Sequence, residues 1–234
     1  MTDAHPRRNV PLTVLAALAA LAAALTFGTG AMDVASVTRL GGVFSSVMTG
    51  NLVLLGLAAA RPSGELAAHT VLAFAGYVTG AALGTWIAGP PRPREQAWPV
   101  AVTLALVVEL AVMGVFSAGW ELTGAQPTGG PELALLAVAT LGMGLQSAAV
   151  RGLGTTVSTT YLTGTLTGVV ASLVAKQPSR HFDLRSVAVL SAVAVGAAVG
   201  GVLIVTAPAV LPALPLATLT VVIAAAAYHH TQQT

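Results

Sequence analysis

Long apolar runs separated by short polar loops dominate the pattern of hydrophobic and polar positions along this chain. Six runs come close to the ~20 apolar residues that an α-helix needs to cross the hydrocarbon core of a membrane. They are Pro11–Met32, Leu66–Gly89, Pro99–Ala118, Pro131–Val150, Ser186–Thr206 and Leu211–Tyr228. The pattern therefore predicts an all-α fold, a polytopic membrane helix bundle with about six spans.

Two further apolar runs, Gly42–Ala60 and Thr155–Ala175, are nearly as long but are rich in Gly, Ser and Thr. The pattern alone leaves open whether they are full spans or re-entrant, discontinuous segments. Cytoplasmic loops carry an excess of Lys and Arg. With eight full spans, the basic clusters at 92–94 and 176–185 cannot both be cytoplasmic.

With six spans, both clusters and the Arg7-Arg8 pair fall on the cytoplasmic side. The loops 121–132 and 207–211, which contain no Lys or Arg, then fall outside. We therefore expect six crossings with both termini in the cytoplasm. Together with the Ala- and Val-rich usage, this predicts a multi-pass protein of the bacterial cytoplasmic membrane, in contact with the lipid bilayer.

The composition excludes several classes of protein. Hydrophobic residues make up 55% of the chain and charged residues only 8%, against roughly a quarter charged in soluble domains. There are no cysteines, which rules out disulfides and thiolate metal sites. The net charge of +2 gives no reason to expect nucleic-acid binding. No hydrolase, metalloprotease or P-loop motif occurs, so we expect no enzyme activity, no cofactor and no metal.

The chain resembles itself at a spacing of 114 residues. Placing Gly28 on Gly142 also superposes Gly30 on Gly144 and the Thr49-Gly50 step on Thr163-Gly164. Small residues recur at spacing four at 76–84 and again at 192–200, which is typical of closely packed membrane helices. Coincidence among abundant small residues is the alternative. We interpret residues 1–120 and 121–234 as two repeats within one membrane domain. Three crossings per repeat make them inverted, as in many secondary transporters.

The two polar segments are where a solute site is expected. Each begins with glycines that are expected to loosen a helix end, Gly28 and Gly30 in the first segment and Gly142 and Gly144 in the second. Each then passes through hydroxyl residues to a Thr-Gly step, followed by a short apolar stretch. Thr49 and Thr163 are candidate N-caps of two half-helices, whose first turns would present free N–H groups and the positive ends of the helix dipoles. Ordinary tilted helices are the alternative. The predicted substrate-binding residues are Thr49, Gly50, Asn51, Thr163, Gly164, Thr165 and Gln146.

These segments also carry a resemblance to a known family. The run Asp33-Val-Ala, then Gly42-Val-Phe44, then Met48-Thr-Gly-Asn51 and Gly56 resembles the signature of the YoaK family of bacterial integral membrane proteins. The stretch from Gly142-Met through Gln146 to Thr160–Thr167 is similar to that family's second conserved stretch. The resemblance implies a membrane protein of about six spans and supplies no substrate, because the family is one of unknown function.

Four ionisable residues lie within or beside apolar stretches: Asp33, Arg39, Glu109 and Arg151. Such residues are costly in lipid and are candidates for ion or proton coupling. For Asp33 a structural role in holding the following loop is the alternative. His69, near a helix end, is expected to be solvated, and the tryptophans at 86, 98 and 120 are expected to anchor span ends at the membrane interface.

The sequence therefore predicts a small secondary transporter or permease for a small polar or anionic solute, compatible with a homo-oligomer. The alternative is a membrane scaffold or regulatory subunit that transports nothing. The inverted repeat and the paired Thr-Gly segments favour the transporter.

Overall fold

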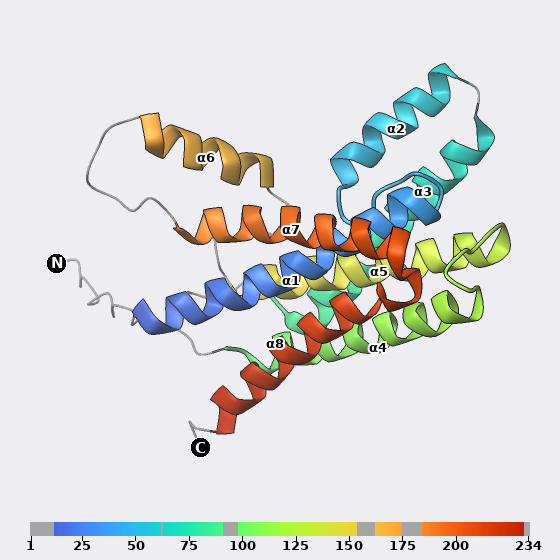
Figure 1. The fold of residues 1–234 in the computed structure, drawn as a ribbon. Helices are drawn as coiled ribbons and strands as arrows, with labels where there is room; N and C mark the ends of the chain where they lie inside the picture. The colour runs from blue at the N-terminus through green and yellow to red at the C-terminus, as the bar shows by residue number, and fades with distance from the viewer. Residues whose placement is uncertain (1–11, 62, 91–97, 154–161, 175–183, 232–234) are drawn as a thin grey trace.

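The chain folds into a bundle of long helices with two short ones on its flank (Figure 1). The computed structural model describes residues 12–61, 63–90, 98–153, 162–174 and 184–231. The long helices are α1 (Leu12–Arg39), α3 (Gly64–Ala88), α4 (Val100–Leu122), α5 (Gly130–Gly152), α7 (Leu184–Thr206) and α8 (Ala213–Thr231). The short ones are α2 (Met48–Ala60), α6 (Leu162–Val174) and the 3-10 turn η1 (Pro208–Val210).

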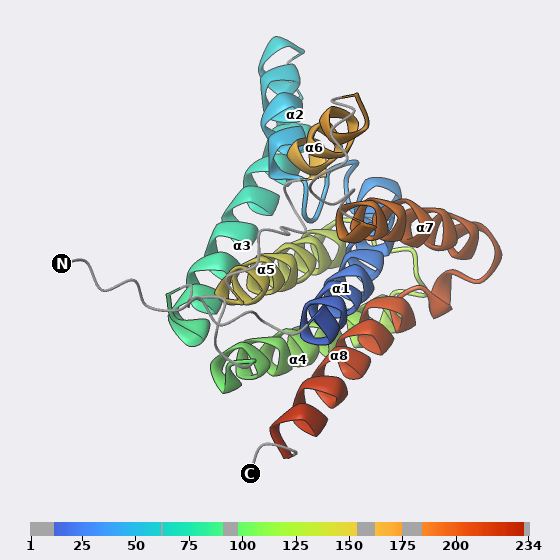
Figure 2. The same ribbon diagram turned by 90° about the vertical axis from the view of Figure 1, so that its left-hand side faces the viewer.

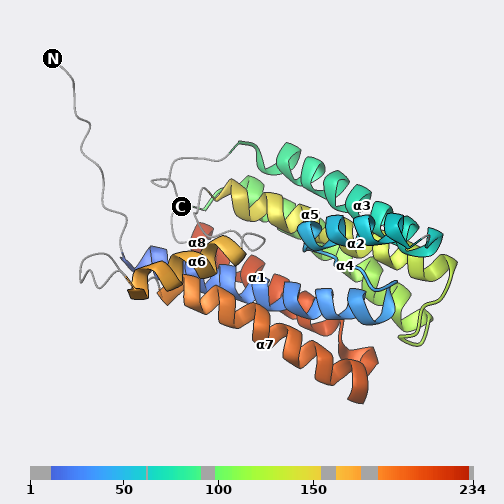
Figure 3. The same ribbon diagram turned by 90° about the horizontal axis from the view of Figure 1, so that it is seen from above.

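All six long helices contain a segment long and apolar enough to cross a membrane. Helices α1, α4 and α7 run in one direction and α3, α5 and α8 in the other (Figures 1 and 3). Helix α1 ends and α3 begins at the same end of the bundle, while α5 ends and α7 begins at the opposite end. Neither α2 nor α6 therefore makes a net crossing. The prediction of an all-α bundle with about six spans is confirmed, and the two further apolar runs contain the shorter helices α2 and α6.

Helices α1 and α5 form the centre of the bundle, and the other four long helices surround them (Figure 2). The first span is longer than predicted. Gly28 and Gly30 were expected to loosen a helix end, but α1 continues through both to Arg39. The expectation was wrong because these glycines serve helix packing: a side chain on Gly30 would run into the backbone of Val193 in α7.

Close glycine contacts fasten two helix pairs, α3 with α5 and α7 with α1, as predicted from the small residues at spacing four. A Cβ atom on Gly80 of α3 would collide with the carbonyl oxygen of Leu141 in α5. One on Gly196 of α7 would collide with the carbonyl oxygen of Phe27 in α1. Backbones that approach this closely gain extensive van der Waals contact, which is the main force between helices in lipid.

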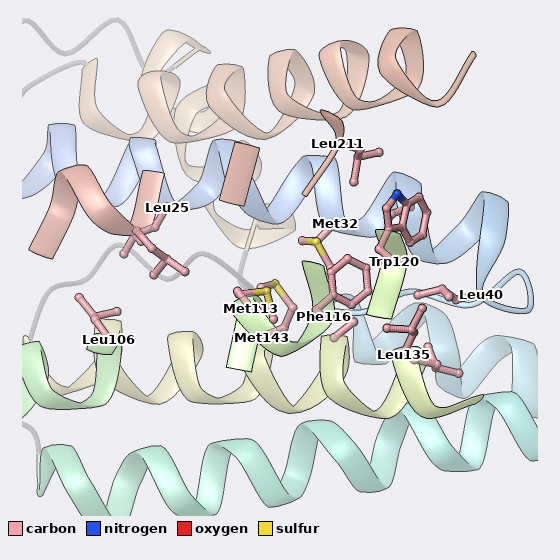
Figure 4. Close-up of a cluster of buried hydrophobic side chains, with 14 of the residues drawn as sticks. Leu25, Met32, Leu40, Leu106, Met113, Phe116, Trp120, Leu135, Met143 and Leu211 are labelled. Atoms are coloured by element: carbon pink, nitrogen blue, oxygen red, sulfur yellow. The ribbon is translucent and has the colours of Figure 1, made fainter. Parts of the chain in front are cut away.

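The buried core is almost wholly apolar and includes Met32, Met113, Phe116 and Met143 (Figure 4). Trp120 belongs to this core, contrary to the prediction of an interfacial anchor. Its ring is fully buried and stacks on Phe116, with ring centroids 5.6 Å apart. Its Nε1–H donates to the carbonyl oxygen of Pro208 at 2.9 Å. The side chain thus ties α4 to the turn between α7 and α8.

Candidate functional site

The loop 40–47, between α1 and α2, is held by the carboxylate of Asp33. Oδ1 accepts from the backbone N–H of Ser45 at 2.9 Å, from that of Ser46 at 2.8 Å and from the Ser45 hydroxyl at 2.9 Å. Oδ2 accepts from the Ser46 hydroxyl at 2.6 Å. Hydrogen bonds to an ionised acceptor are among the strongest in proteins.

Asp33 lies six residues before Arg39, at which α1 ends. At 1.5 Å per residue this is about 9 Å along the helix axis. The loop must return by that distance for Ser45 and Ser46 to reach the carboxylate. Helix α2, which begins at Met48 two residues after Ser46, consequently starts near the depth of Asp33 and not at the end of α1.

Asn51 holds the same loop from the other side. Its Oδ1 accepts from the backbone N–H of Phe44 at 2.9 Å, and its Nδ2 donates to the carbonyl oxygen of Phe44 at 2.8 Å. The side chain is fully buried. Both ends of the amide are therefore used by the loop, which gives Asn51 a structural role, and its binding of solute stays a prediction.

A histidine from α3 also packs against this loop. His69 of α3 is buried, and its Nδ1 is 2.8 Å from the carbonyl oxygen of Glu65. Its Nε2 lies 3.3 Å from a carboxylate oxygen of Glu132, at the start of α5. The ring packs on Gly41, where φ is +81° and any side chain would strike the imidazole. The prediction of a solvated histidine was wrong because this close approach covers the ring.

Helix α2 begins at Met48 with Val47 as its N-cap, and no side chain caps it. The prediction that Thr49 caps the helix was therefore wrong. Thr49 is exposed in the first turn and Gly50 is half-buried. Their backbone N–H groups have no acceptor among the described residues, as is usual for the first turn of a helix. The positive end of the α2 dipole thus has Asp33 on its buried side and open donors beyond it.

The corresponding start of α6 is less enclosed. Thr163 and Gly164 are exposed in its first turn, and Thr165 is half-buried. Helix α6 begins at Leu162, so Thr163 is already its second residue. The residues between Gly154 and Tyr161, which include part of the predicted second polar segment, lie outside the described residues.

Gln146 is buried at the contact between the two central helices. Its Nε2 donates to the hydroxyl of Thr29 at 2.9 Å and approaches the carbonyl oxygen of Leu25 at 3.3 Å. Thr29 in turn bonds back to Leu25 within α1 at 3.1 Å. Gln146 therefore cross-links α5 to α1 in the interior of the bundle.

Glu109 differs from every other acidic residue of the described chain. Its side chain is fully buried in the middle of α4, and neither carboxyl oxygen has a hydrogen-bond partner among the described residues. Burial of an ionised carboxylate without a partner is very costly. A carboxyl in this position is stable in its neutral, protonated form.

The two arginines sit at helix ends. Arg39, the last residue of α1, is half-buried, and Arg151, near the end of α5, is exposed. No ion pair between either of them and Asp33 is found in the described part of the chain. Nor do three His, Asp or Glu side chains of that part gather so that they could hold a metal ion.

Apart from the two arginines, the predicted residues thus fall into three places. Asp33 and Asn51 meet at the loop before α2, Gln146 and Glu109 lie in the bundle interior, and the Thr-Gly steps begin the two short helices. Sequence reasoning missed the partners of these groups: Ser45, Ser46, Thr29 and the His69–Glu132 pair. The hydroxyl-rich composition of the loop was the available signal for Ser45 and Ser46.

Comparison with known proteins gives a family but no activity. A family model described as "Protein of unknown function (DUF1275)" matches residues 21–227. The UPF0700 transmembrane protein YoaK of Bacillus subtilis (strain 168) is 33% identical over 154 residues, which cover 65% of this chain and 64% of that protein. The match therefore spans less than two thirds of the relative's own length. No solved structure matches the chain.

Proposed function

The chain belongs to the DUF1275 family of proteins of unknown function, and we propose that it is a small secondary transporter or permease for a small polar or anionic solute. One observation carries the proposal. The two short helices lie on the same flank of the bundle, run in opposite directions, and have their first turns as the ends nearest to each other (Figures 1 and 3). Half-helices that start inside a membrane are typical of transporter solute sites.

The packing of the long helices supports an inverted repeat, with residues 1–120 as one copy and 121–234 as the other. If α1 is exchanged with α5, α3 with α7 and α4 with α8, the contacts of α1 become those of α5. Helix α1 packs on α7 and α8, and α5 packs on α3 and α4.

Contacts of individual glycines follow the same correspondence between the two copies. A side chain on Gly30 would meet Val193 and Ala197, and one on Gly144 would meet Tyr77 and Ala81. Gly30 and Gly144 are 114 residues apart, and both pairs of partners are 116 apart. Each copy runs through three crossings, so the two copies have opposite orientations in the membrane. Many secondary transporters share this plan.

In this proposal the solute lies between the two helix starts, held by the backbone N–H groups of Thr49 and Gly50 at α2 and by the first turn of α6, which contains Thr163 and Thr165. Backbone donors and the positive ends of two helix dipoles favour an anionic or strongly polar group. Asp33 already complements the α2 start on its buried side. Asn51 acts on the solute only through the loop that it holds.

A scaffold or regulatory subunit is the second candidate, and one observation favours it. The polar side chains nearest the start of α2, Asp33 and Asn51, are fully engaged by the loop. A loop that already satisfies these two polar side chains does not require a solute to do so.

The absence of cysteine makes the geometry directly testable. The paired substitutions Thr49→Cys and Thr163→Cys should be joined by a short bifunctional thiol reagent. A control pair that moves the second cysteine one turn along α6, to Thr167, should react more slowly. If the first pair is joined by long reagents but not by short ones, the two helix starts lie too far apart to share a solute, and the scaffold is favoured.

Transport itself is tested with purified protein reconstituted into liposomes. Uptake of labelled monocarboxylates, inorganic anions and neutral amino acids would be measured against protein-free vesicles. Saturable uptake of one class, abolished by the bulky substitution Gly164→Trp and retained with Val170→Trp on the exposed outer part of α6, is the expected result. Leakage equal to that of empty vesicles for the whole panel would contradict the proposal.

A further inference from the structure

The ionisable residues of the spans differ in whether they are free to exchange a proton. Asp33 accepts four hydrogen bonds that fix the loop before α2. Arg39 and Arg151 lie at helix ends, where Arg39 is half-buried and Arg151 is exposed. Among the described residues of the six spans, Glu109 combines full burial with two unpartnered carboxyl oxygens.

Glu109 occupies a core position of α4. The buried face of this helix consists otherwise of apolar residues: Val102, Ala105, Leu106, Met113, Phe116 and Trp120. Leu106 and Met113, which flank Glu109 on that face, point into the apolar core (Figure 4). Glu109 lies nine residues from the start of α4, about 14 Å along its axis. This is near the middle of a hydrocarbon core of ~30 Å.

The register of α4 against α5 places a polar neighbour at this depth. These helices are antiparallel, with Gly142 against Met113 and Gly152 against Val102. Moving four residues from Met113 to Glu109 therefore moves four residues from Gly142 to Gln146. Gln146 is the residue that bonds to Thr29 of α1. The carboxyl is thus level with the polar cross-link between the two central helices.

No charged group shares this level in the described parts of the helices that pack on α4. On α5, Arg151 is five residues from Gln146 and exposed, and Glu132 is near the opposite end of the helix. On α3, Glu65 and His69 are near its start, and Tyr77 is two turns from Gly84, which packs at the level of Leu145 and Ala148. On α8, Tyr228 is close to the far end.

We propose that Glu109 is the residue that binds and releases the proton to which transport is coupled, an inference that rests on the proposed transport function. A hard metal cation needs several oxygen ligands at once, whereas a proton needs one carboxyl oxygen. In the arrangement described here the neutral carboxyl is closed off from water. Release of its proton requires a second arrangement of the bundle in which water reaches α4, as alternating access provides.

Infrared difference spectroscopy of the purified full-length protein in lipid, with the proton itself as the probe, tests the inference. The wild type should show the band of a protonated buried carboxyl at neutral pH. This band should be absent from Glu109→Gln and unchanged in Glu121→Gln, an exposed acid at the end of the same helix. It should shift in D₂O and disappear as the pH is raised. If Glu109→Gln does not fold, Glu109→Asp should move the band instead.

Two results would overturn the inference. A wild-type spectrum without a protonated carboxyl assignable to Glu109 would show that the group is charged and paired. A band that neither shifts in D₂O nor responds to pH while the protein stays folded would show a permanently protonated structural residue. Neither result depends on knowing the solute. An empty solute panel would therefore count against the transport proposal while leaving the proton site intact.

Discussion

Asp33 and Glu109 are both acidic side chains buried within membrane spans, yet their surroundings are opposite. Asp33 has four hydrogen-bond donors around it, supplied by two residues of one loop. Glu109 has none among the described residues. A buried carboxylate with a full set of donors stabilises a structure, whereas one without them is a cost that only function repays. The two acids thus differ as a carboxyl that holds a loop and one that, in our proposal, exchanges a proton.

The largest effect is expected from removing the structural carboxyl. Asp33→Ala leaves two backbone N–H groups and two hydroxyls of a buried loop without their acceptor. Unsatisfied buried donors cost about 1–3 kcal/mol each, and rotation of the hydroxyls recovers part of this. We expect a loss of about 3–5 kcal/mol in the free energy of unfolding. Denaturant unfolding in detergent micelles measures it.

Asp33→Asn is the control for that substitution. Its amide oxygen retains the two backbone donors, and its NH₂ group can donate to the Ser46 hydroxyl. We expect it to recover more than half of the loss. Equal stability of Asp33→Ala and the wild type would contradict the assignment of Asp33 to the loop.

A smaller loss is expected at the other side of the loop. Asn51→Leu removes two hydrogen bonds and leaves the N–H and C=O of Phe44 unpaired, which should cost about 2–3 kcal/mol. Thr49→Leu, in the same turn but exposed, should leave the unfolding midpoint where it is. An unchanged midpoint for both variants, together with lost transport in Asn51→Leu, would instead restore Asn51 as a solute ligand.

Two buried serines test the same contrast with a smaller expected change in stability. The Ser46 hydroxyl donates to Asp33 at 2.6 Å, while the fully buried Ser36 hydroxyl has no partner among the described residues. Ser46→Ala should therefore cost about 1 kcal/mol and Ser36→Ala about nothing. The difference between their unfolding midpoints is the measurement. A costlier substitution at Ser36 would reveal a partner for that hydroxyl.

The smallest change in stability is expected at Glu109. Gln has the shape of a protonated Glu, and no hydrogen bond to the described residues is broken by the exchange. Glu109→Gln should change the free energy of unfolding by less than about 0.5 kcal/mol, within the range of neutral substitutions. A loss as large as that of Asp33→Ala would show that the carboxyl is ionised and paired, and the contrast between the two acids would disappear.

The spans could be predicted from the sequence because lipid imposes a simple length and composition rule. Five of the six were predicted within a few residues of their observed bounds. The first ends at Met32 in the prediction, seven residues before the observed end of α1 at Arg39, and Gly28 and Gly30 were expected to loosen that end. They are tolerated because α7 and α8 pack against the face that they leave open. Local propensity is overridden here by tertiary packing.

The partners of the polar residues could not be predicted in the same way. Gln146 and Thr29 are 117 positions apart, and their contact depends on the register of two central helices. His69 was expected to be solvated because it lies near a helix end, but Gly41 and Glu132 come from two other elements to cover it. Only Glu109 was recognisable from its own surroundings, since an acid flanked by Val108 and Leu110 must face protein.

The pairing of α1 with α7 has a consequence for how the chain is assembled during synthesis. Helices α3 and α5 are separated by one span, so they can pack through their glycines while the ribosome is still making the rest of the chain. Helix α1 must wait in the membrane until α7 emerges, some 150 residues later, before Gly196 and Gly200 can reach it. The first helix to be inserted is therefore among the last to find its main partner. Until then the face of α1 around Phe27 and Ala31, on which Gly196 and Gly200 pack, is exposed to lipid, to other chains and to the insertion machinery.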